Sequence, residues 1–189
     1  MNGKYEMRFT GSGGQGVILA SIIFAEAGVI KGIHAVQSQA YGPEARGGSS
    51  KAECILSSGP IWFSKVRMPD FLLALTQTAL DKYASELAPD AVVMIDESLR
   101  APEGVDPGRV ISVPVLRAAT EQVGRAITAN IVAVGAINAL LGLFDDEVLR
   151  ESLRRHIPAG TEELNFRALE VGASLIPQEL RGRFSPAEG

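Results

Sequence analysis

GSGGQGV, at residues 11–17, lies between a strand-like segment at residues 5–10 and a helix-like segment at residues 17–31. A glycine-rich turn in this position presents backbone N–H groups at a helix N-terminus, where the helix dipole favours an anion. The glycines at 11, 13 and 16 match the G-x-G-x-x-G spacing, which in a strand–turn–helix context indicates a nucleotide or phosphate site. The candidate cofactor-binding residues of this turn are Gly11, Ser12, Gly13, Gly14, Gln15 and Gly16.

The turn lacks the acidic partner that completes an NAD site. That fingerprint places a carboxylate about twenty residues further on, at the end of the second strand, to bind a ribose hydroxyl. Val36, Gln37 and Ser38 occupy this place. We therefore do not expect ordinary NAD binding, and a tight turn with no ligand remains the alternative to a phosphate site.

Apolar runs alternate with helical periods along the rest of the chain. Strands are predicted at residues 34–39, 71–76, 91–96 and 109–115, and helices at 78–88, 118–125, 129–144, 146–156 and 161–175. Residues 50–58 and 61–66, separated by Gly59 and Pro60, read as a hairpin. The pattern predicts a three-layer α/β/α fold with a Rossmann-like, mainly parallel, mixed sheet. We expect one domain at residues 1–176 and a flexible tail at 177–189.

A second candidate segment is YGPEARGGSS, at residues 41–50. Pro43 stiffens it, and its paired glycines permit unusual backbone angles. Tyr41, Glu44, Arg46 and Gly47 are its candidate binding residues, although a solvated turn would have the same composition. Because ligands bind at the carboxyl ends of strands in such sheets, we expect this loop to lie beside the glycine turn, after an adjacent strand.

Composition excludes several classes of function. A net charge of -4 is unlike that of a nucleic-acid-binding protein, and the single cysteine, Cys54, cannot hold an iron–sulfur cluster or a four-cysteine zinc site. Hydrophobic residues make up 46 % of the chain, and with its 20 glycines the apolar share exceeds the usual 45–50 % or so. Such an excess predicts burial against a partner or self-association, as a homodimer when the chain is isolated.

No set of residues forms a recognisable catalytic centre or metal site. The chain has no G-x-S-x-G, H-E-x-x-H or P-loop motif, and no Gly-Asp-Gly that would hold the magnesium of thiamine diphosphate. The most apolar run, residues 127–144, contains Asn130 and Asn138 and falls short of a membrane span. We expect a cytoplasmic binding or assembly subunit that has no catalytic residues of its own and contacts no membrane.

Five segments together resemble one family. They are GSGGQGV, AYGPEARGGSS at 40–50, ALTQTALDKY at 74–83, VVMIDESL at 92–99 and TANIVAVGAINALLGLF at 128–144. In this order the chain resembles the gamma subunits of 2-oxoacid:ferredoxin oxidoreductases and the third domain of single-chain pyruvate:ferredoxin oxidoreductases. The resemblance runs from about residue 8 to residue 173, and GGQG and YGPE-x-RGG are its most specific parts.

The resemblance implies a share in a larger enzyme that decarboxylates a 2-oxoacid, forms an acyl-CoA and reduces ferredoxin. Its partners would be alpha and beta subunits, with a delta subunit in some complexes. Thiamine diphosphate, Mg²⁺, iron–sulfur clusters and CoA are expected in the complex, and none is bound by this chain alone. The length of the unfused chain favours 2-oxoglutarate over pyruvate, branched and indolepyruvate-type acids. The alternatives are a free-standing nucleotide- or flavin-binding Rossmann protein and a purely structural scaffold.

Overall fold

The computed structural model describes residues 3–41 and 49–186, which build a six-stranded sheet in the order β2-β3-β1-β4-β5-β6. β1 pairs in parallel with β4, β4 with β5, and β5 with β6, whereas β3 is antiparallel to both β1 and β2. The predicted mixed, mainly parallel α/β fold is confirmed. The strands are β1 (Lys4–Ser12), β2 (His34–Tyr41), β3 (Ser49–Ser57), β4 (Phe71–Ala74), β5 (Val92–Asp96) and β6 (Val110–Val113).

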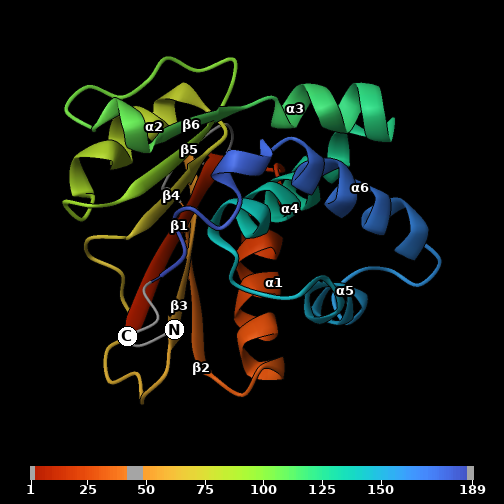
Figure 1. The fold of residues 1–189 in the computed structure, drawn as a ribbon, viewed down its shortest axis with the longest axis horizontal. Coiled ribbons are helices and arrows are strands. Elements are labelled where there is room, and N and C mark those ends of the chain that lie inside the picture. Colours follow the sequence, from red (N-terminus) through yellow and green to blue (C-terminus); the bar gives the residue numbers. More distant parts are fainter. Residues whose placement is uncertain (1–2, 42–48, 187–189) are drawn as a thin grey trace.

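Helices cover both faces of the sheet (Figure 1). α2 lies on one face, and α1, α4, α5 and α6 lie on the other, where they form the larger core. No helix among the described residues has both the length and the hydropathy to cross a bilayer. The helices are α1 (Val17–Ile30), α2 (Gln77–Tyr83), α3 (Val115–Ala118), α4 (Ala129–Leu141), α5 (Asp146–Arg154) and α6 (Glu162–Ser174).

β4 is wholly apolar, and β5 is apolar up to Asp96, because each of these strands contributes side chains to two hydrophobic cores. Side chains alternate across a strand, so Leu73 and Met94 pack with α1 and α4 while Leu72 and Val93 pack with α2. Every residue of β4 and of β5 is buried as a result. Continuous rather than alternating hydrophobicity is the expected pattern for parallel strands covered on both faces.

α4 is the most deeply buried helix, with twelve of its thirteen residues buried. It crosses α6 at two glycines that bring the helix backbones into contact. A Cβ added to Gly135 would lie 2.0 Å from the carbonyl oxygen of Leu169, and one added to Gly172 would lie 1.9 Å from that of Val132. The interpretation of this segment as a core helix with close backbone packing is confirmed.

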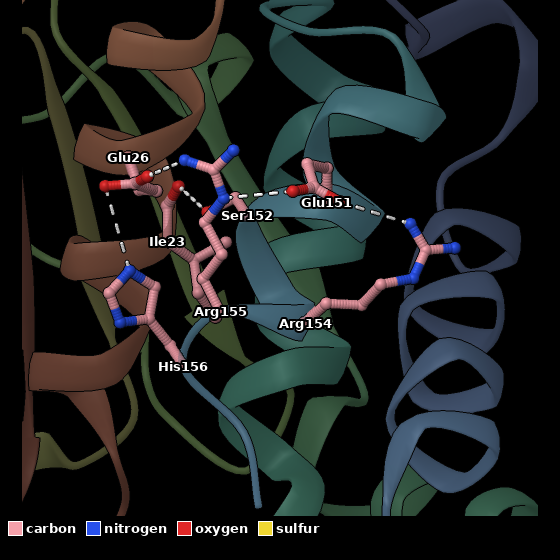
Figure 2. Close-up of polar contacts among 7 residues, drawn as sticks. All are labelled: Ile23, Glu26, Glu151, Ser152, Arg154, Arg155 and His156. Carbon is pink, nitrogen blue, oxygen red and sulfur yellow. Dashed lines mark hydrogen bonds and ion pairs between the residues drawn. The ribbon is translucent and has the colours of Figure 1, made fainter. Parts of the chain in front are cut away.

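α5 is attached to α1 by one buried hydrogen bond and a rim of ion pairs (Figure 2). Ser152 Oγ donates to the carbonyl oxygen of Ile23 at 2.8 Å. Around it, Arg155 reaches Glu26 at 2.6 Å and Glu151 at 3.0 Å. Because exposed ion pairs contribute little, the buried bond and the apolar face of α5 account for most of this attachment.

One predicted element was wrong, and the bounds of another differ. Residues 61–66 form no strand, and the hairpin of this sheet consists of β2 and β3 instead. The helix predicted at 118–125 begins earlier, as α3, and ends in a π-helical turn at Ala119–Val123. In the tail, Gly182 N–H donates to the carbonyl oxygen of Ala139 at 3.0 Å. The division into a domain and a flexible tail stays a prediction.

Candidate functional site

The glycine turn joins β1 to α1 through two left-handed residues. Gly16 is the N-cap of α1 with φ of 69°, and Gly14 has φ of 91°, a conformation that side chains other than glycine rarely adopt. Gln15 closes the turn, since its Oε1 accepts the N–H of Ser12 at 2.6 Å and its own N–H donates to the carbonyl oxygen of Ser12 at 3.2 Å. The backbone path itself therefore requires glycine at positions 14 and 16.

The turn lies where neighbouring strands send their helices to opposite faces of the sheet. β1 and β4 are adjacent and parallel, and α1 and α2, which follow them, lie on different faces (Figure 1). Open α/β sheets bind ligands at the carboxyl edge of such a pair. Gln15 Nε2 donates to the carbonyl oxygen of Leu75 at 3.5 Å and so links the two strand ends. The candidate site is therefore at this edge.

A second helix N-terminus meets the turn. Asn130, the second residue of α4, donates from Nδ2 to the carbonyl oxygen of Gly16 at 3.3 Å. A Cβ on Gly16 would lie 2.5 Å from that nitrogen, so the side chain packs directly on the glycine. The positive ends of two long helices thus meet at one place. Asn130 was not predicted as a site residue, although an asparagine at the start of an apolar helix was a usable signal.

The second predicted segment, residues 41–50, begins and ends at the edge of the sheet where the glycine turn lies. Ser12 pairs with Ser49, the first residue of β3, and Tyr41, the last residue of β2, pairs with Ser50. The loop was predicted to follow a strand adjacent to that of the glycine turn. This was wrong, because β1 and β2 are not adjacent and β3 lies between them. Glu44, Arg46 and Gly47 lie outside the described residues, and so does everything between the two strand ends.

Two other polar or reactive residues have structural roles. Asp96, 2 % exposed, accepts hydrogen bonds from Ser98 N–H at 3.1 Å and from Leu116 N–H at 2.9 Å, so it caps α3 and its own turn. Burial raises the pKa of the Cys54 thiol well above its usual range, as expected of an inert core cysteine. No group of three or more metal-ligating side chains occurs within residues 3–41 and 49–186.

The groups available at this carboxyl edge of the sheet are backbone N–H donors, which can bind an anion. The N–H groups of Ser12 and Gln15 are used within the turn. Those of Gly13, Gly14 and Gly16 have no acceptor among the residues that the structure describes, and Gly13 and Gly14 are exposed. Three N–H groups beside two helix N-termini suit a phosphate or carboxylate.

Comparison with known proteins identifies the family. The family model described as pyruvate ferredoxin/flavodoxin oxidoreductase matches residues 6–175. The chain belongs to this family. Its resemblance to the gamma subunits is confirmed by the 2-oxoglutarate synthase subunit KorC of Methanocaldococcus jannaschii, 41 % identical over 89 % of this chain and 92 % of that protein.

Other members of the family show the same unit alone and within a longer chain. The crystal structure of the gamma subunit of a keto/oxoacid ferredoxin oxidoreductase from Geobacter sulfurreducens is 43 % identical, with a TM-score of 0.79 over 92 % of this chain and 96 % of that one. The ketoisovalerate oxidoreductase subunit VorA of Methanothermobacter thermautotrophicus is 34 % identical over 95 % of this chain but only 38 % of its own length. This oxidoreductase unit therefore occurs both as a separate subunit and joined to further polypeptide.

Proposed function

We propose that this chain is the gamma subunit of a 2-oxoglutarate:ferredoxin oxidoreductase. The complex would convert 2-oxoglutarate and CoA into succinyl-CoA and CO₂ and pass the electron pair to ferredoxin. The observation that carries the proposal is the 41 % identity to a 2-oxoglutarate synthase subunit over nearly the whole of both chains. The lower identity of 34 % to a ketoisovalerate oxidoreductase subunit supports 2-oxoglutarate over branched substrates.

The redox chemistry of this reaction belongs to partner subunits in this proposal. Iron–sulfur clusters require several cysteine thiolates, and the one cysteine here is buried with a raised pKa. The described residues also offer no cluster of carboxylates and imidazoles for a metal. Alpha and beta subunits, with a delta subunit in some complexes, would therefore hold thiamine diphosphate, Mg²⁺ and the clusters.

The contribution of this chain would be an anion site completed by a neighbour. The N–H groups of Gly13, Gly14 and Gly16 fit a phosphate of CoA or of thiamine diphosphate held mainly by a partner, or a carboxylate of that partner. Tyr41, Glu44, Arg46 and Gly47 would add contacts from the second loop. A shielded charge-assisted bond from Arg46 would contribute roughly 1.5–3 kcal/mol.

The substrate is tested with the assembled complex. The chain and its partner subunits are produced together, and viologen reduction is measured with CoA and each of 2-oxoglutarate, pyruvate, 2-oxoisovalerate and indolepyruvate. The highest kcat/KM is expected for 2-oxoglutarate, and a preference for another acid would contradict the assignment. The isolated chain should give no turnover, because it carries none of the required cofactor chemistry.

The glycine site is tested by Gly13→Val. A Cβ added at Gly13 meets no atom within 4 Å among the described residues, so the fold should tolerate the substitution while access of the anion is blocked. The matched control is Gly108→Val, whose Cβ would have the Asp106 side chain as its nearest neighbour, at 3.4 Å. Activity or assembly should fall with Gly13→Val and persist with Gly108→Val. Equal activity of the two variants would favour the scaffold alternative.

A further inference from the structure

A compact apolar surface lies on the segment between β3 and β4, far along the chain from the glycine turn. Among the described residues, five large hydrophobic side chains are exposed, and three of them lie between residues 62 and 68. Trp62 is 91 % exposed, Phe63 49 % and Met68 53 %. Exposed aromatic side chains that are this close together mark interaction sites in many proteins.

The same segment forms one wall of a hollow of about 320 Å³. The hollow is lined by Phe63, Met68, Lys65, Arg67, Lys4 and Glu6. We refer to these six residues together with Trp62 as the Trp62 surface. Its form, with aromatic and thioether groups beside a concavity, is that of a pocket that receives an anchoring side chain.

The segment is held in place although its outer side chains are free of contacts to the core. Arg8, 1 % exposed, donates from Nη2 to the carbonyl oxygen of Val66 at 3.1 Å. At the end of the segment, Asp70 and Glu6 exchange two hydrogen bonds of 2.8 Å, one from each backbone N–H. A surface that is already ordered loses less conformational entropy when it binds, which favours association.

The charge of this surface is opposite to that of the chain. The chain carries a net charge of -4, yet Lys65 and Arg67 take part in no ion pair within the part of the chain that the structure describes. Arg67 lies over the Phe63 ring at 5.1 Å from its centroid, which keeps the guanidinium at the rim of the hollow. Charge complementarity therefore requires an acidic partner.

A second copy of the chain does not meet this requirement. A two-fold dimer brings the same patch of both copies together, so two surfaces of net positive charge would face one another. Like charges placed across an interface cost several kcal/mol. The unit also occurs as 38 % of a longer relative, in which it is joined to further polypeptide of the same subunit.

We propose that the Trp62 surface binds a neighbouring subunit of the oxidoreductase. The matching patch of that subunit would have an apolar centre ringed by Asp and Glu side chains. The inference rests on the proposed subunit role and adds a location and a chemistry for the contact. On this chain, Trp62 and Met68 form the centre of the interface, and Lys65 and Arg67 form its basic rim. This interface is separate from the anion site at the carboxyl edge.

The test uses the complex, produced with an affinity tag on a partner subunit. The amount of this chain that is retained is measured at rising salt for two double variants, Trp62→Ser with Met68→Ser and Lys65→Glu with Arg67→Glu. Each should lower the affinity for the partner at least tenfold, as expected when a hot-spot aromatic or a complementary charge is lost. The charge variant should also reduce the dependence of binding on salt.

Matched controls lie outside the Trp62 surface. Val29→Ser changes an apolar side chain that is 57 % exposed, and Arg183→Glu changes an arginine that lies over Phe184 as Arg67 lies over Phe63. Both controls should leave the affinity within twofold of wild type. The melting temperature of each isolated variant, followed by circular dichroism, should stay at the wild-type value, and if the serine variant fails to fold the charge variant decides.

Four outcomes separate the possibilities. Loss of the partner in both double variants with retention in both controls supports the proposal. If the wild-type chain assembles and both double variants are fully retained in the complex, the proposed interface is wrong, and the proposed function still stands. The proposed interface is also wrong if the isolated wild-type chain is a dimer and the double variant Trp62→Ser with Met68→Ser is a monomer. Failure of the wild-type chain itself to assemble removes the proposed function and this inference together.

Discussion

Replacing either glycine at the crossing of α4 and α6 should destabilise the protein by an amount that the structure sets. The Cβ of Gly135→Ala would lie 2.0 Å from the carbonyl oxygen of Leu169 and 2.9 Å from its carbon. Both are backbone atoms, so no rotamer change relieves the overlap. The helices must separate by about 1.4 Å to restore an ordinary contact of 3.4 Å.

The expected magnitude is the difference of two terms. Overpacking a close-packed interior costs up to about 3 kcal/mol, and alanine gains roughly 0.5–1 kcal/mol over glycine within a helix. The net loss is therefore about 2 kcal/mol in the free energy of unfolding, equivalent to a melting temperature lower by about 4–8 °C for a chain of this size. Gly172→Ala should cost a similar amount because its Cβ meets Val132 in the same way.

The assay is urea unfolding followed by circular dichroism. Gly13→Ala is the control, since its Cβ meets nothing within 4 Å, and its midpoint should match wild type. The double variant of Gly135 and Gly172 should cost less than the two single costs together, because helices already separated by one methyl group make room for the other. Unchanged or raised midpoints for both single variants would refute the direct backbone contact.

Two further predictions concern the polar face of the sheet. Arg8→Ala should lower the free energy of unfolding by about 3 kcal/mol, measured by urea unfolding, because it removes the arginine 2.9 Å from the buried Glu53 carboxylate and leaves Lys51 as the one charged partner among the described residues; a loss below about 1 kcal/mol would contradict this. Burial raises the pKa of Asp70 above its usual range, so stability from this group is higher at acid pH and declines as pH rises through the folded-state pKa. Asp70→Asn, which keeps the acceptor for Glu6 N–H at 2.8 Å, should therefore flatten that decline in melting temperature between pH 4 and pH 7 or so, and an unchanged pH profile would exclude it.

The parallel core and the glycine turn could be predicted because their signals are local. A continuous apolar run such as residues 92–95 is stable only when it is buried on both faces of a sheet, and Gly14 and Gly16 are required by their positive φ values. The hairpin predicted at residues 50–66 was wrong because Gly59 and Pro60 indicate a turn but do not indicate which strand pairs with the preceding one. β3 pairs with β1, some forty residues earlier, and this pairing depends on hydrogen bonds that no sequence period encodes.

The candidate site was predictable only where it is continuous in sequence. The turn at residues 11–16 was found from its spacing, whereas Asn130 reaches it from a helix more than a hundred residues away. Arg8 was placed in the predicted strand at residues 5–10 with no role of its own, whereas its side chain is buried among Glu53, Glu86 and the carbonyl oxygen of Val66. Contacts of this kind between distant segments arise from the packing of the elements, which the periodicity of each element does not specify.

Trp62 is the single tryptophan of the chain, and it is 91 % exposed. Its fluorescence will therefore be quenched by iodide in the folded protein as readily as in the unfolded one, and will report almost nothing about the core. The same property makes it a background-free reporter elsewhere. With 5-fluorotryptophan incorporated only into this chain, one ¹⁹F resonance would follow the local environment of this side chain during assembly, however many tryptophans its partners contain.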